Sequence, residues 1–186
     1  MGRLARRPNR PAEPYAHQLL NDLIDASIEL AVRCDPALRL IGWKEILLHP
    51  KLPRETRDAS RPFRISIEDA TLIPDGRPFV LQRTMPDGSK KYLCVPGKEI
   101  DRHTEPLVPS DLKRSGIVGK FNLYQKFFAD RLYQSHYGFP NAVIPIITTN
   151  AKHLENMMAL AREQIGACTF LLFKHCLLYT SDAADE

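Results

Sequence analysis

The chain has 186 residues, of which 44% are hydrophobic and 26% are charged, and its formal net charge is +4. This composition excludes a disordered chain, and the lack of a long apolar run excludes a membrane-spanning helix. We expect one globular domain with a single core, whose positive charge favours an anionic partner, nucleic acid first.

The two ends of the chain differ from the rest. Residues 1–14 hold four arginines before any acid and three prolines, which predicts a flexible basic arm that can contact phosphates. Residues 176–186, "CLLYTSDAADE", resemble a translated sequencing adapter, so we expect a natural chain cut short near His175. Without the three acids of this tail, the formal charge rises from +4 to +7. The folded domain is expected over residues 15–175.

The cysteines give no sign of a metal or disulfide framework. Outside the tail, Cys34, Cys94 and Cys168 lie far apart, and the sequence contains no Cys-x-x-Cys pair. Unpaired thiols suit a reducing compartment, and no signal peptide is visible, so we expect a cytoplasmic protein.

The first half of the domain begins with a helix and continues as strands. Leucine and isoleucine recur at helical spacing over residues 15–34, which predicts an amphipathic helix. A short strand is expected at residues 38–43, followed by a proline-rich loop. Residues 65–104 alternate β-branched and apolar runs and contain Asp87-Gly88, which predicts strands joined by a tight hairpin.

The second half alternates helices and strands. Residues 109–138 predict one long helix that starts at Ser110 or Asp111 and ends at Gly138. A buried strand at 142–149, a helix capped by Asn150 and a strand at 168–174 follow. This order predicts a mixed α/β layer fold.

Folding the hairpin brings acidic residues together. If the chain folds about residue 87, Asp75 lies opposite Glu99, whereas a two-residue turn at Asp87-Gly88 puts Asp75 opposite Ile100, between Glu99 and Asp101. Both registers gather Asp75 with at least one of the other acids. They also place Pro78 close to Pro96, and since neither proline has an N–H, the ladder is expected to be interrupted there.

These three acids allow two interpretations. Carboxylates that converge on one hairpin face suit a hard divalent cation, Mg²⁺ or Mn²⁺, so Asp75, Glu99 and Asp101 are candidate metal ligands. The alternative is a solvated strand end, at which Arg77, Lys98 and Arg102 form ordinary salt bridges.

Four short motifs carry a family resemblance. "LIPDG", "EIDRHTEPL", "GKFNLYQ" and "VIPIITTN", in this order, resemble the plasmid and phage replication-relaxation family, within the PD-(D/E)xK nuclease-like superfamily. The resemblance spans residues 15–174. It implies a restriction-endonuclease-like core of three layers, with a mixed central sheet flanked by helices, and a DNA-related role in replication or mobilisation.

The same resemblance implies roles for individual residues. Asp75 corresponds to the motif Asp, Glu99 to the motif acid, and Asp101 to a third position that is normally Lys in the nucleases. Lys120, four residues before Tyr124 on the next helix, could supply the missing lysine and stabilise charge on a phosphate. The chain is therefore expected to be a metal-dependent DNA phosphodiesterase or, alternatively, a non-catalytic DNA-binding accessory factor with a degenerate nuclease fold.

Several other residues are weaker candidates. Asp25 and Glu29 share a helix face and could add a metal ligand, and His103 is the histidine nearest the acids in sequence. No phosphate-binding glycine loop occurs, so no small-molecule cofactor is expected. The residues expected to contact DNA are Arg3, Arg6, Arg7, Arg10, Lys113 and Arg114.

Overall fold

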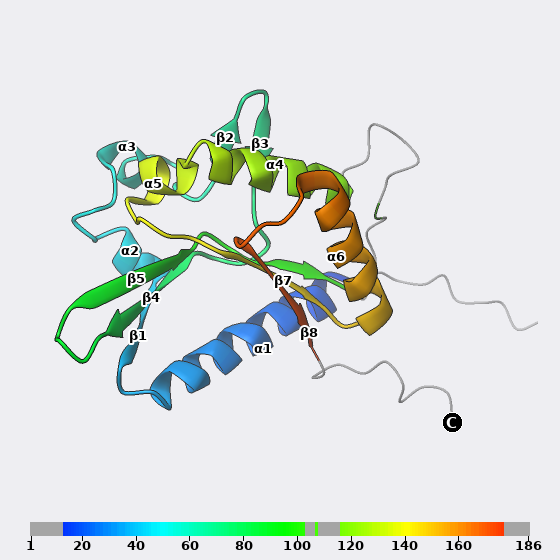
Figure 1. The fold of residues 1–186 in the computed structure, drawn as a ribbon. Coiled ribbons are helices and arrows are strands. Elements are labelled where there is room, and N and C mark those ends of the chain that lie inside the picture. Colours follow the sequence, from blue (N-terminus) through cyan, green and yellow to red (C-terminus); the bar gives the residue numbers. More distant parts are fainter. Residues whose placement is uncertain (1–12, 103–106, 108–115, 177–186) are drawn as a thin grey trace, which may run out of the picture.

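The computed structural model describes residues 13–102, 107 and 116–176. In this part of the chain the strands form two three-stranded sheets and one two-stranded hairpin, with helices packed around them (Figure 1). The predicted mixed α/β class is confirmed. No described helix combines the length and the apolar character needed to cross a membrane.

Helix α1 (Glu13–Arg33) is the amphipathic helix expected at the start of the domain. Its residues Leu20 and Ile24 are buried against Ile100 and Ile147. Because the last two residues belong to strands of one sheet, α1 covers one face of that sheet (Figure 1). As a result, the polar side chains of α1 that flank its apolar face also lie close to these strands.

The first large sheet is antiparallel. It contains β1 (Leu38–Gly42), β4 (Phe79–Thr84) and β5 (Lys90–Val95), in the order β1-β4-β5. Between β1 and β4, the chain forms the short helices α2 (Trp43–Ile46) and α3 (Arg54–Arg57). It then forms a small hairpin from β2 (Ile65–Ile67) and β3 (Ala70–Leu72).

The β4–β5 hairpin has the first of the two expected registers. Thr84 pairs with Lys90 and Phe79 with Val95, and the turn contains Gly88 at φ +78°. The left-handed conformation of this residue is one that glycine adopts without steric cost. Continued beyond the strands, this register places Asp75 opposite Glu99.

The hairpin ladder is interrupted at the two prolines, as predicted. Strand β4 begins after Pro78 and β5 ends before Pro96, and neither proline can donate to the ladder. Pairing resumes two residues further along each segment, where the Gly76 N–H donates to the carbonyl oxygen of Lys98 at 3.2 Å. The segment that contains Asp75 therefore runs beside the strand that contains Glu99.

The second large sheet is parallel and carries the acids. It contains β6 (Glu99–Asp101), β7 (Ile144–Thr148) and β8 (Leu171–His175), in the order β6-β7-β8. Helices α4 (Ile117–Ala129) and α6 (Ala151–Ile165) cover the face opposite α1 (Figure 1). The Asn150 side chain caps α6 by accepting from the His153 N–H at 2.8 Å, as expected.

The prediction of one long helix over residues 109–138 is wrong. Helix α4 begins at Ile117 and ends at Ala129, and a separate helix α5 (Leu132–Tyr137) follows. Arg131 lies between them at φ 52°, a left-handed conformation that ends an α-helix. The proposed caps Ser110 and Asp111 lie outside the described residues, whereas the predicted end at Gly138 is confirmed by its φ of +76°.

The strands do not form one sheet. The family resemblance implied one mixed central sheet, but the hydrogen bonds divide the strands into separate antiparallel and parallel sheets. A parallel bridge between Cys94 and Ala142 joins the two large sheets. The interruption at the prolines accounts for the division, since β5 and β6 would otherwise be one strand.

Candidate active site

Asp75 lies in the loop after β3, against the edge of β6. One oxygen of its carboxylate, Oδ2, accepts a hydrogen bond from the Ile100 N–H at 3.0 Å. The other, Oδ1, lies 3.9 Å from His17 Nε2 on α1. The Asp75 side chain is 24% exposed, so it is held by the strand and still reaches solvent.

Glu99 is the buried centre of the site. It is only 5% exposed, and its carboxylate accepts hydrogen bonds from Lys120 Nζ at 2.9 Å and from the Tyr124 hydroxyl. Burial raises the pKa of Glu99 to about 7, and the nearby negative charge of Asp75 adds to this rise while Lys120 opposes it. Asp75 and Glu99 are therefore electrostatic neighbours, as the hairpin register predicted.

Lys120 points toward the acids, as the sequence predicted. It lies on α4 one turn before Tyr124, so both side chains reach Glu99 from the same face of the helix. Its side chain is 26% exposed. A lysine that is ion-paired with a buried carboxylate and open to solvent at the same time can also meet an anion from outside.

Asp101 faces the same helix layer as Glu99 but contacts a different helix. Its Oδ2 lies 2.5 Å from His153 Nε2 on α6, and both side chains are buried. The sequence pointed instead to His103, which lies outside the described residues. His153 was missed because the contact depends on how α6 packs against β6, and the chain separates the two residues by 52 positions.

The burial of Glu99 and Asp101 contradicts the alternative of a solvated strand end. Lys98 is fully buried, and its Nζ lies 2.5 Å from Asp25 Oδ1 on α1. Arg77 lies over the Trp43 ring, 4.7 Å from its centroid. Glu29, the other helix acid considered as a metal ligand, forms an exposed pair with Arg33 at 3.5 Å.

Helix α1 brings to the site Asp25, which the sequence marked as a weaker candidate, and also His17 and Asn21, which it did not. Asn21 Nδ2 donates to the backbone oxygen of Asp75 at 3.2 Å. His17, Asn21 and Asp25 are spaced four apart, so they share one face of α1. This spacing is the signal that would have identified His17 and Asn21, and the three residues lie beside the apolar residues Leu20 and Ile24 on the helix.

The described residues contain no group of three or more His, Cys, Asp or Glu side chains arranged to hold a metal. The Asp75 and Glu99 carboxylates do interact electrostatically, however, and Mg²⁺ is commonly bound by one or two carboxylates together with waters and substrate phosphates. Asp75 and Glu99 fit such a site, whereas Asp101 is bonded to His153.

Asn21, whose amide nitrogen contacts the Asp75 backbone, has an amide oxygen without a partner. In the described part of the chain, Asn21 Oδ1 is the one buried side-chain polar atom without a hydrogen-bond partner. Leaving such an atom unbonded costs about 1–3 kcal/mol. An amide oxygen is also a ligand that hard cations accept.

A small cavity adjoins the buried half of the site. It has a volume of about 20 Å³ and is lined by residues that include Glu99, Asp101, Lys120 and Tyr124. Such a space is large enough for about one water molecule and too small for a substrate. A substrate would therefore reach the site from the exposed side, where Asp75 and Lys120 are partly open.

The residues expected to contact DNA cannot be placed. Arg3, Arg6, Arg7, Arg10, Lys113 and Arg114 all lie outside the described residues.

Comparison of the chain with protein-family models, curated proteins and solved structures gives no significant match. The function proposed below therefore rests on the geometry of the site and on the sequence motifs.

Proposed function

We propose that this protein is a DNA-associated factor that cleaves DNA as a metal-dependent phosphodiesterase, in replication or mobilisation of a plasmid or phage. The observation that carries the proposal is the contact of Lys120 with Glu99, beside Asp75. Two carboxylates and a lysine that converge from a loop, a strand and a helix are the groups that phosphodiester hydrolysis needs. The motifs that resemble the replication-relaxation family contain the same three residues.

Each residue has a chemical role in this proposal. Glu99 would hold the metal ion through its buried carboxylate. Tyr124 holds the Glu99 carboxylate in place. Lys120 can stabilise the negative charge that develops on the phosphate. Mg²⁺ or Mn²⁺ held by Asp75 and Glu99 would activate the water and neutralise the phosphate.

A second candidate function is a non-catalytic DNA-binding accessory factor. One observation favours it: both Glu99 oxygens are hydrogen-bonded, to Lys120 and Tyr124, and Asp101 is bonded to His153. Such a network can stabilise the fold without doing chemistry. In that case DNA binding would weaken as salt rises, because phosphate contacts dominate it, but it would not depend on metal.

Plasmid cleavage separates the two candidates. Supercoiled plasmid is incubated with the protein and Mg²⁺ or Mn²⁺, with EDTA as the metal-free control. We expect nicking that Lys120→Met lowers by about a hundredfold. Lys126→Met is the matched control, because Lys126 is on the same helix and pairs with the exposed Glu68. Binding without cleavage under every metal condition would support the accessory factor instead.

A further inference from the structure

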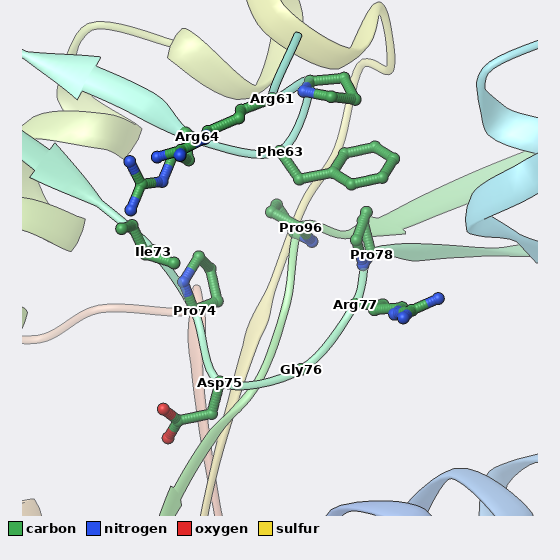
Figure 2. A pocket seen from close by; sticks show the side chains of 11 residues that line it. Arg61, Phe63, Arg64, Ile73, Pro74, Asp75, Gly76, Arg77, Pro78 and Pro96 are labelled. Carbon is green, nitrogen blue, oxygen red and sulfur yellow. The ribbon is translucent and has the colours of Figure 1, made fainter.

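A second, more open pocket lies on the other side of the Asp75 segment. It has a volume of about 270 Å³ and lies between the small β2–β3 hairpin and the two prolines that interrupt the ladder (Figure 2). This size is near the lower end of ligand sites, which suits one small unit of a ligand. In Figure 2 the Asp75 carboxylate points away from the pocket, so its backbone forms a shared rim.

Two arginines supply positive charge on one side of this pocket. Arg61 and Arg64 are both exposed, and the Arg64 N–H donates to the Arg61 oxygen at 3.1 Å, which places both residues in one turn. Among the described residues neither guanidinium has an acidic partner, whereas Arg39 and Arg54 are paired with Glu45 and Asp58. Unpaired guanidinium groups in a pocket suit a phosphate, which they can bind with two parallel hydrogen bonds.

The other side of the pocket is apolar and rigid. It is formed by Phe63 with Pro78 and Pro96, and Figure 2 shows the Phe63 ring on the side away from Arg64, while Pro74 lies below Arg64 beside Ile73. The Phe63 ring is held in place by Tyr137, whose ring is nearly parallel to it at 6.4 Å. A fixed aromatic ring beside proline rings presents a flat apolar surface of the kind on which nucleobases stack.

We propose that this pocket binds one unpaired nucleotide of the DNA strand, next to the phosphate at the candidate active site. Phe63 and the prolines contact the base, and Arg61 and Arg64 contact its phosphate. The inference rests on the proposed function, because a DNA strand that fills both the pocket and the candidate active site must cross the rim at Asp75. Since a base must leave the double helix to enter the pocket, the substrate class is single-stranded DNA, or DNA with an unpaired end or flap.

Binding measurements in EDTA test the pocket without any cleavage. Fluorescence anisotropy is measured with a labelled oligothymidylate, with the same strand lacking its bases, and with a duplex of equal length. We expect the oligothymidylate to bind at least about fivefold more tightly than the abasic strand, because stacking contributes about 1–3 kcal/mol per base. It is also expected to bind more tightly than the duplex. Equal binding of all three would overturn the inference.

Matched variants locate the contact. Arg61→Ala combined with Arg64→Ala should weaken oligothymidylate binding about tenfold, because two charge-assisted contacts are lost. Arg83→Ala combined with Lys91→Ala removes the same charge from two exposed residues that lie opposite each other in the β4–β5 ladder, near the hairpin tip. This double variant should change oligothymidylate binding less than about twofold. Phe63→Leu should remove the preference for bases over the abasic strand. Equal losses in both double variants would show only general attraction to phosphate and would refute the pocket.

The outcomes also separate this inference from the proposed function. If the strand binds as expected but no metal gives cleavage, the phosphodiesterase is refuted and the pocket stands. If plasmid is cleaved but the pocket variants bind and cleave like the wild type, the phosphodiesterase stands and the pocket is refuted.

Discussion

The tripeptide Pro-Asp-Gly occurs twice in this chain, and the two copies have different surroundings. Around Asp87 it forms the exposed tip of the β4–β5 hairpin, where the carboxylate bonds only to the adjacent Ser89. Around Asp75 it lies against a buried strand, with Ile100 bonded to the carboxylate and Glu99 close by.

The comparison shows what local sequence decides and what it does not. The same three residues can close a turn in either place, but only tertiary packing puts one aspartate beside a second acid. Burial then changes the chemistry: the pKa of Asp87 is lowered by its hydrogen bonds to Ser89, whereas burial raises the pKa of Glu99 beside Asp75.

The largest expected difference between the copies is in catalysis. Asp75→Asn should abolish metal-dependent plasmid cleavage, by a factor of about a hundred or more, because a site ligand is lost. Asp87→Asn should cleave like the wild type, since Asp87 is fully exposed at the hairpin tip. Equal activity of the two variants would mean that Asp75 has no part in the chemistry.

The glycines of the two copies should differ in stability. A Cβ at Gly76 would lie 2.5 Å from Cγ of the buried Lys98, and overpacking of this kind costs about 1–3 kcal/mol. Gly88→Ala meets no atom within 4 Å, but its φ of +78° costs about 1 kcal/mol. Urea denaturation should therefore rank Gly76→Ala as the more damaging change, and the reverse order would contradict the close approach of Gly76 to Lys98.

The pH dependence of stability should have opposite signs at the two sites. The pKa of Glu99 is raised from 4.5 to about 7, so between these values the unfolded chain loses its proton first. The free energy of unfolding should then fall as pH rises through this window, and Glu99→Gln should remove the slope. Asp87 has a lowered pKa, so its contribution is present above pH 3.8 and is lost in more acidic solution.

Denaturant titrations on both sides of each window measure these slopes. The Glu99 effect is expected to reach the order of a few kcal/mol. Asp87→Asn should leave the slope between pH 4.5 and 7 unchanged, and a wild-type curve that is flat across this window would show that Glu99 titrates normally.

The hairpin and its acids could be predicted because they depend on short-range rules. Asp87-Gly88 marks a turn, the register follows from that turn, and the prolines mark where the ladder stops. Lys120 was also predictable, since it is one turn from Tyr124 on a helix whose apolar stripe faces the sheet.

The remaining contacts depend on how separate elements pack, which spacing along the chain does not give. The pairs Asp101–His153 and Lys98–Asp25 join residues 52 and 73 positions apart. Asn21 reaches Asp75 across a similar gap of 54 positions. The break between α4 and α5 was missed because the two residues between these helices, Asp130 and Arg131, are neither glycine nor proline, which are the usual signals of a helix end.

The meeting of Asp75 with Glu99 is most directly tested by following the Glu99 side-chain carboxyl by NMR as a function of pH. In the wild type we expect a midpoint near 7, and in Asp75→Asn a lower one, because a neighbouring negative charge has been removed. Asp87→Asn should leave the midpoint unchanged. A Glu99 midpoint that is the same with and without the Asp75 charge would contradict the account.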